Sequence, residues 1–120
     1  MSYARLRKLG VWKKAHELAL YTYRITNDFP RDEVFGLRNM MRKTSIDIPA
    51  IVAEGCGKQY PQEFTHSLNT AIGFSNRLEY YGIMARDLEF LPLTVFEEFS
   101  GRLAEVRMMA SGLSKKVSVV

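Results

Sequence analysis

Apolar residues recur along the chain at alternating steps of three and four positions, in four stretches separated by breaks that contain proline or glycine. This spacing places the apolar side chains on one face of an α-helix, and no stretch has the strict alternation of a half-buried strand. It predicts helices over about residues 9–28, 33–56, 61–89 and 92–116. Because short connections favour antiparallel neighbours, the expected fold class is all-α, an antiparallel up-down-up-down four-helix bundle with residues 1–120 as a single domain.

Each predicted helix carries one apolar line that should face the core. The first line is widened by Trp12, Ala19 and Tyr23, which favours a core-facing helix over a narrow coiled-coil seam. A glycine inside a helix costs about 1 kcal/mol relative to alanine, so Gly73 and Gly82 are predicted to allow close approach by a neighbour. The four lines are Val11, Ala15, Leu18, Thr22, Ile25 and Phe29; Val34, Leu37, Met41, Thr44, Ile48 and Ile51; Phe64, Leu68, Ala71, Ser75, Leu78, Gly82 and Ala85; and Phe99, Leu103, Val106, Ala110, Leu113 and Val117.

The second predicted helix contains the residues that set its ends and its shape. Asp32 is expected to be its N-cap, because a short oxygen-bearing side chain can accept a backbone N–H of the first turn. Pro49 lies inside the apolar pattern, removes one backbone hydrogen bond and crowds the carbonyl four residues earlier, so the helix should bend or be locally broken there. Gly55 and Gly57 are interpreted as the signals that end it.

Charge is unevenly distributed along the chain. The formal net charge is +4, but residues 1–60 hold 11 Lys and Arg against 6 Asp and Glu, whereas residues 61–120 hold 6 against 7. A basic first half suits a polyanionic partner, although a solvated basic face that aids solubility is an equal alternative. The first cluster of cations contains no acid and comprises Arg5, Arg7, Lys8, Lys13 and Lys14.

The remaining composition is that of an ordinary globular protein, and three features of the sequence bear on its cellular compartment. The single Cys56 has no intramolecular partner for a disulfide, which favours a reducing environment. Residues 1–10 lack the apolar core of a signal peptide, and no apolar run approaches the ~20 residues of a membrane span. We therefore expect a cytoplasmic protein with no membrane partner.

Several stretches together resemble one protein family. Residues 34–37 read V-F-G-L, residues 42–55 read R-K-T-S-I-D-I-P-A-I-V-A-E-G, and residues 9–15 read L-G-V-W-K-K-A. These stretches are similar to the 23S rRNA-intervening sequence protein family of bacterial four-helix bundles, over roughly residues 6–115. The most specific part is the ending of the second helix, carried by the structural motif residues Pro49, Glu54 and Gly55.

The resemblance implies a bundle with a proline-kinked second helix, a ring-like homopentamer and an association with nucleic acid, either RNA or DNA. Three positions depart from the family pattern: Met40 replaces a polar residue, Asp47 a serine and Ile51 an asparagine. The asparagine would satisfy backbone groups that the proline frees. The departures leave the fold untouched and bear only on the roles of single residues.

A second cluster of cations lies at the start of the second helix. Arg38 and Arg42 are four residues apart and so share a face, with Lys43 beside them. Guanidinium groups bind phosphate oxygens in pairs, so the cluster is a candidate nucleic-acid contact. The alternative is that these cations pair with acids of the bundle or of a neighbouring subunit, such as Glu33, Asp47 or Glu54.

Catalytic and metal-binding interpretations have less support. A di-iron carboxylate bundle needs two Glu-x-x-His motifs, but only Glu63 and His66 form one, since His16 has no glutamate at that spacing. Asp47 and Glu54 share a face of the second helix, which favours ion pairing over acid–base chemistry. Cys56 has no histidine nearby in sequence to activate it. We expect no enzyme, no metal and no cofactor.

Aromatic residues allow two interpretations. They could be platforms on which unpaired bases stack, but aromatic residues on bundle helices more often belong to a core or a subunit interface, which is the interpretation favoured here. The sequence thus predicts a non-enzymatic, self-assembling bundle with a basic surface for nucleic acid, and its alternative is a purely structural or interaction module. The aromatic candidates are Trp12, Tyr21, Tyr23, Tyr60, Tyr80 and Tyr81.

Overall fold

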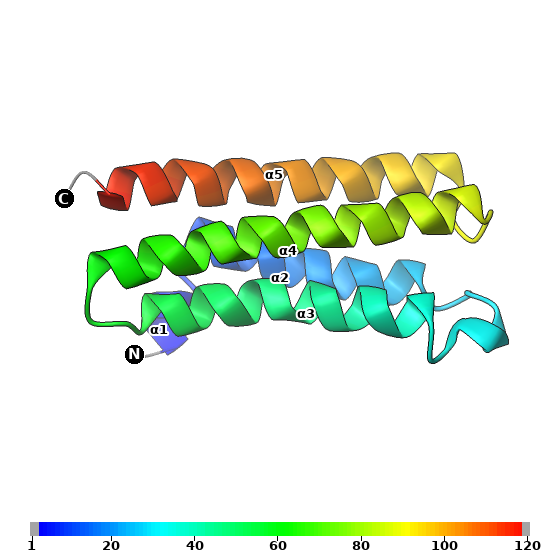
Figure 1. Cartoon of the computed structure of the whole chain (residues 1–120), viewed down its shortest axis with the longest axis horizontal. Helices are drawn as coiled ribbons and strands as arrows, with labels where there is room; N and C mark the ends of the chain where they lie inside the picture. Colours follow the sequence, from blue (N-terminus) through cyan, green and yellow to red (C-terminus); the bar gives the residue numbers. More distant parts are fainter. Residues whose placement is uncertain (1–2, 119–120) are drawn as a thin grey trace.

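The structure, a computed structural model, describes residues 3–118 and is an elongated bundle of 46 × 22 × 19 Å (Figure 1). Helices and turns make up the described chain, and no strand occurs in it. The all-α prediction is therefore confirmed. The elements are α1 (Tyr3–Leu6), α2 (Gly10–Ile25), the 3₁₀ turn η1 (Arg31–Glu33), α3 (Leu37–Cys56), α4 (Pro61–Asp87) and α5 (Leu93–Ser118).

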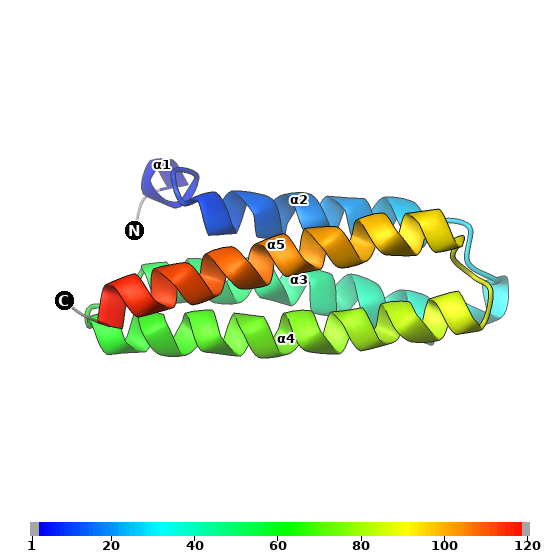
Figure 2. The same cartoon turned by 90° about the horizontal axis from the view of Figure 1, so that it is seen from above.

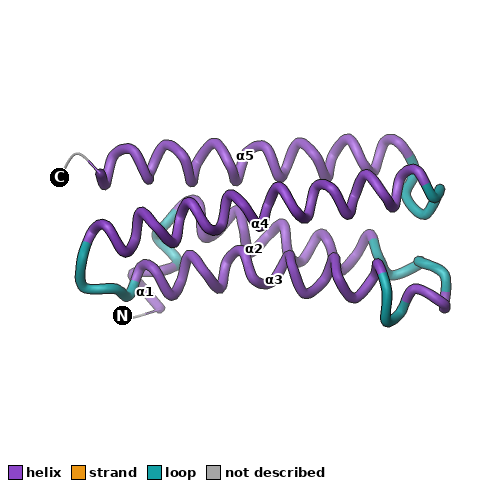
Figure 3. The backbone as a smooth tube through the Cα atoms, in the orientation of Figure 1, coloured by secondary structure: helices purple, strands orange, loops and turns teal. Residues whose placement is uncertain are grey.

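The four long helices alternate in direction, as short connections require. Helix α2 packs against α3 and α5, and α4 packs against the same two helices, so each long helix has two neighbours around the bundle (Figures 1 and 2). Short loops and turns join them at the two ends, as the tube view shows (Figure 3). The α2–α3 and α4–α5 connections lie at one end, and the α3–α4 connection lies at the other.

The predicted apolar lines form the core. Each long helix supplies fully buried side chains, among them Leu18, Met41, Leu68 and Phe99. Burial of a large aliphatic or aromatic side chain contributes roughly 1.5–3 kcal/mol, so these lines hold the helices together. Tyr23 is an exception, because its side chain is 40% exposed and lies outside the core that the first line was expected to widen.

The predicted N-cap of the second long helix is wrong. Helix α3 begins at Leu37 after a turn, and Asp32 lies exposed in η1. The carboxylate of Glu33 caps the helix instead: its Oε2 accepts a hydrogen bond from the backbone N–H of Leu37 at 3.1 Å. The longer glutamate side chain reaches across the turn from η1 to the first orphan donors of the helix, which the shorter Asp32 does not do.

Helix α3 runs without interruption through Pro49, whose ring is buried. A local break at the proline, one of the two predicted outcomes, is therefore absent. Gly57 is the C-cap residue, as predicted, but Gly55 lies inside the helix. A Cβ on Gly55 would collide with Ser67 of α4, so this glycine permits close helix approach and does not end the helix.

The glycines of α4 also differ from each other. A Cβ on Gly82 would run into the ring of Phe99 on α5, which confirms the predicted close approach. Gly73 is exposed and has open space around it, so the same prediction is wrong there. Helix α4 thus contacts the Phe99 ring of α5 at Gly82, and its Ser67 packs against Gly55 of α3.

Candidate nucleic-acid interface

The predicted cations fall at two separate places. Arg5, Arg7, Lys8 and Lys13 are exposed around α1 and the first turn of α2, at the end of the bundle where α3 finishes (Figure 1). The other cluster lies in the first turns of α3, at the opposite end. The structure therefore does not join the eight predicted cations into one surface.

The α3 cluster lines a hollow of about 500 Å³ between the end of α2 and the start of α3, here called the basic hollow. Its size is within the range of small-ligand clefts. Three of its residues are cations and none is an acid. The lining consists of Tyr23, Val34, Phe35, Arg38, Asn39, Arg42, Lys43 and Ile46.

Arg42 is anchored to the last turn of α2. Its Nε donates to Thr26 Oγ1 at 2.9 Å, its Nη2 donates to the carbonyl of Tyr23 at 3.0 Å, and its guanidinium lies 4.5 Å from the centre of the Tyr23 ring. The carbonyls of a final turn lack helical partners and carry the negative end of the helix dipole, so a cation is favoured there. Arg42 is accordingly a clamp between two helices.

Burial lowers the pKa of Arg42 from its ordinary value, and the positive charge of Arg38 lowers it further. Both effects disfavour the charged form, the first because water is removed and the second because like charges repel. Arginine stays protonated regardless. The hollow therefore contains concentrated positive charge that its own residues do not neutralise.

The side chains of Arg38 and Lys43 form no hydrogen bond or ion pair with any residue in the described part of the chain. The predicted alternative of pairing with acids of the same bundle is thus not found. Glu33 caps α3 instead, and no described ion pair involves Asp47 or Glu54. Lys43 is exposed and Arg38 is half-buried, so both can contact a ligand.

Two aromatic side chains share the hollow with the cations. Phe35, in the turn just before α3, is 93% exposed, and Tyr23 presents part of its ring. The sequence prediction missed Phe35. A signal was present, because Phe35 falls off the apolar line that passes through Val34 and Leu37.

An apolar hollow continues from the basic one along α2 and α3. The two share Tyr23 and Ile46, which are 40% and 45% exposed. Leu20, 49% exposed, is the most exposed aliphatic side chain in its lining. The apolar hollow is lined by His16, Ala19, Leu20, Tyr23, Ile46 and Pro49.

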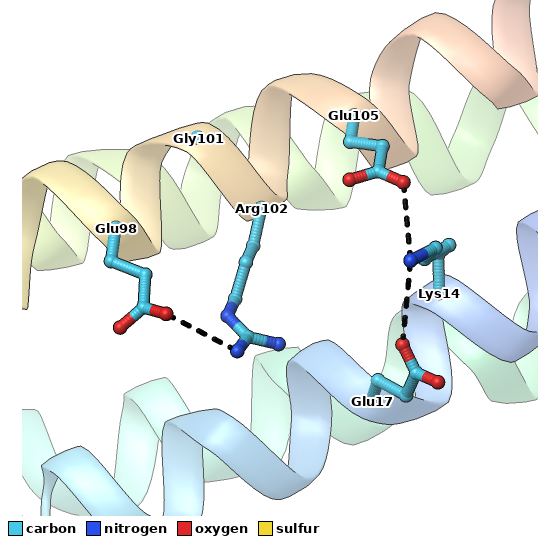
Figure 4. Close-up of a pocket in the computed structure, with 6 residues that line it drawn as sticks. All are labelled: Lys14, Glu17, Glu98, Gly101, Arg102 and Glu105. Atoms are coloured by element: carbon cyan, nitrogen blue, oxygen red, sulfur yellow. Dashed lines mark hydrogen bonds and ion pairs between the residues drawn. The ribbon is translucent and has the colours of Figure 1, made fainter.

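On the other side of α2, against α5, lies a groove with a different electrostatic character, here called the paired groove (Figure 4). Lys14 Nζ lies 3.4 Å from Glu105 of α5 and 3.8 Å from Glu17. Arg102 donates to Glu98 Oε1 at 3.3 Å. Lys14, predicted as part of a ligand-binding cluster, therefore has acidic partners within the bundle.

Tyr21 of α2 bonds to Glu98, one of the residues that line the paired groove. It is buried, its hydroxyl donates to Glu98 Oε2 at 2.7 Å, and the Arg102 guanidinium lies 4.3 Å from its ring centre. Burial, with Glu98 beside it, raises the pKa of Tyr21 to about 12. The same hydrogen bond lowers the pKa of Glu98. Tyr21 is thus part of the packing and not a surface platform.

The other predicted candidates occupy scattered positions. His66 and Glu63 are exposed at the start of α4, and His16 stacks on Trp12 with ring centres 5.2 Å apart. Cys56 is buried. Among residues 3–118 no three His, Cys, Asp or Glu side chains gather as a metal site would require, and no helix there has the length and apolarity to cross a membrane.

The remaining aromatic candidates lie away from the basic hollow. Tyr60, the N-cap residue of α4, and Tyr80, within α4, are both exposed. Tyr81 is half-buried, and its ring centre lies 6.4 Å from that of Tyr80. Only Tyr23, of the six predicted aromatic residues, lines the hollow that holds unpaired cations.

A family model described as 23S rRNA-intervening sequence protein matches residues 7–112. The chain belongs to this family. The family match covers all three stretches that carried the resemblance, residues 9–15, 34–37 and 42–55, including Pro49, Glu54 and Gly55.

One solved structure of similar fold is a protein of unknown function from the S23 ribosomal protein family of Bacteroides thetaiotaomicron VPI-5482. It is 19% identical in sequence, with a TM-score of 0.78 over 88% of this chain and 95% of that one. At this identity the likeness concerns the fold alone. No curated protein matches the chain.

Proposed function

We propose that this member of the 23S rRNA-intervening sequence protein family is a self-assembling binding protein, not an enzyme, and that it binds nucleic acid through the basic hollow. The observation that carries the proposal is that Arg38 and Lys43 line an open hollow without an acidic partner. Phosphate groups would supply the missing negative charge, since cations on a polyanion release its condensed counterions and gain free energy. The family's naming after an rRNA intervening sequence agrees with such a ligand.

The test is the affinity for RNA and DNA as a function of salt. Binding of a labelled oligonucleotide is followed by fluorescence anisotropy. The logarithm of the association constant should fall linearly with the logarithm of the salt concentration, with a slope that reflects the number of phosphates contacted. Substituting Arg38 and Lys43 by alanine should reduce that slope by about 2. Absence of binding at low ionic strength would reject the proposal in favour of a purely structural or interaction module.

Self-assembly is supported by the apolar hollow. Leu20, Tyr23 and Ile46 expose apolar surface along one α2–α3 face, and contiguous exposed apolar surface commonly marks a protein interface. We propose a homo-oligomer, with the ring-like pentamer implied by the family resemblance as the expected state. Light scattering should give a multiple of the 13.8 kDa chain mass, and a monomer at micromolar concentration would contradict it. The proposed compartment is the cytoplasm, where Cys56 stays reduced.

A further inference from the structure

An exposed phenylalanine sits beside unpaired cations in the basic hollow. Single exposed apolar side chains are ordinary in proteins and need no special explanation. Phe35 differs because it is 93% exposed and lines the same hollow as Arg38 and Lys43, with the Tyr23 ring also in the lining. Flat apolar surface and unneutralised positive charge are therefore within one small site.

The local backbone holds Phe35 in this position. Leu37, two residues later, is buried in the core and starts α3, while Glu33, two residues earlier, is tied to the backbone N–H of Leu37. Both sides of the turn are thus fastened. The Tyr23 ring is similarly fixed, because the Arg42 guanidinium lies 4.5 Å from its centre and is itself hydrogen-bonded to α2. A ring held in this way, as that of Tyr23 is, loses little freedom when a ligand binds.

From this arrangement we infer that the basic hollow recognises an unpaired nucleotide, whose base stacks on Phe35 while neighbouring phosphates contact Arg38 and Lys43. The inference rests on the proposed function and specifies its ligand as single-stranded nucleic acid. Every base has a π-face, so stacking of this kind tolerates many sequences. A duplex keeps its bases inside the stack and offers the hollow only phosphates.

A second copy of the chain is the main competing occupant, because exposed acids such as Glu54, Glu63 and Glu97 have no ion pair in the described chain. The experiment below therefore includes the oligomeric mass as an outcome. An acidic peptide would satisfy the cations but has no need of an exposed aromatic ring. A nucleotide strand carries both the negative charge and the flat apolar surface.

The experiment compares three ligands of equal length by fluorescence anisotropy at low salt: a single-stranded oligonucleotide, its duplex, and an abasic strand that retains the phosphates. RNA and DNA versions of the single strand distinguish the two sources of the ligand. Phe35→Leu keeps an apolar side chain but removes the ring, and should weaken single-strand binding roughly 5- to 100-fold per stacked base lost. Binding of the abasic strand should not change.

Tyr80→Leu is the matched control, because it removes an exposed aromatic ring from α4, away from the hollow. It should leave all affinities unchanged. If Phe35→Leu also leaves single-strand binding unchanged while Arg38→Ala weakens it, stacking is wrong and the proposed function stands. If no ligand binds wild type at low salt, the proposed function itself fails. A changed oligomeric mass of Phe35→Leu would overturn the inference by assigning Phe35 to a contact between copies.

Discussion

The two hollows that flank α2 differ in how their cations are partnered. In the paired groove against α5, Lys14 and Arg102 face glutamates of the same bundle, and Tyr21 donates to Glu98. In the basic hollow against α3, Arg38 and Lys43 have no acidic partner in the described chain, and only Arg42 is fixed by hydrogen bonds.

The difference follows from where the acids lie. Helix α5 has glutamates on the face turned to α2, at positions 98 and 105, so cations of the two helices find partners across the groove. The first turns of α3 have cations and no acid, and the carboxylate of Glu33, in the turn before the helix, caps it. A cation count alone therefore says little about binding, whereas cations that gather in one hollow without an internal partner are informative.

The largest expected effect concerns the unpaired cations. Removing two phosphate contacts with Arg38→Ala and Lys43→Ala together should weaken binding of a single-stranded oligonucleotide about 25-fold near 0.1 M salt, from the slope of about 0.7 per phosphate contact on a single strand. The matched double change in the paired groove, Lys14→Ala with Arg102→Ala, should have a much smaller effect. Anisotropy titrations of both variants check this, and equal losses would remove the distinction between the two sides of α2.

The next effect concerns stability and separates Arg42 from its neighbours. Arg42→Ala leaves the Tyr23 carbonyl and Thr26 hydroxyl without their charged donor and should lower the free energy of unfolding by about 1–2 kcal/mol. Arg42→Lys should recover only part, since an ammonium cannot reproduce the planar fork. Urea unfolding measures both. Arg38→Ala is the control and should change stability little, because Arg38 has no partner to lose.

In the paired groove, Tyr21→Phe should destabilise the protein less than Arg42→Ala, and its effect should depend on pH. The Glu98 pKa is lowered in the fold chiefly by the Tyr21 hydroxyl, so that contribution is fully present above the ordinary glutamate pKa of about 4.3 and disappears as the pH falls through the folded value. The Tyr21 pKa is raised, so its contribution is present below about pH 10 and is lost as the pH rises toward 12.

The stability difference between wild type and Tyr21→Phe should therefore be flat between about pH 5 and 9 and shrink on both sides. Chemical unfolding at a series of pH values checks the shape. A difference that stays constant into acid would show that the hydrogen bond to the Glu98 carboxylate contributes nothing.

The smallest effect is expected at the surface pair of the same groove. Lys14 and Glu105 are both largely solvated, at 45% and 44% side-chain exposure. Exposed pairs contribute little, so Lys14→Ala should cost less than about 0.5 kcal/mol, and the cost should vanish at high salt. A double-mutant cycle with Glu105→Ala isolates this coupling. A coupling above 1 kcal/mol would mean that the groove is stiffer than its exposure indicates.

Periodicity was sufficient to predict the helices and most core residues, because burial of one face is a property of each segment alone. Buried residues such as Val52, Leu91 and Phe96 lie off the predicted lines. The capping of α3 was not predictable in the same way. Asp32 and Glu33 are both suitable residues, and only the path of the turn decides which carboxylate reaches Leu37. Local sequence preferences cannot choose between neighbours when a three-dimensional turn intervenes.

The candidate site likewise has a part that the sequence predicts and a part that depends on the three-dimensional structure. The first-half positive charge and the Arg38–Lys43 cluster were readable from sequence, but the partners of each cation depend on packing between helices. Arg42 binds the end of α2 and Lys14 binds α5, contacts separated in sequence by 16 and 91 positions. The exposure of Phe35 also depends on the turn that Glu33 and Leu37 set.

The two close-approach glycines have a consequence for how the helices can slide. Ser67 fills the gap at Gly55 of α3, and the ring of Phe99 fills the gap at Gly82 of α4. Moving α4 by one helical turn, about 5.4 Å, would take both side chains out of their gaps and press them against larger neighbours. The two contacts therefore fix the position of α4 along the bundle axis relative to α3 and α5. Through α3 they also fix the axial position at which the first turn of α3 meets α2.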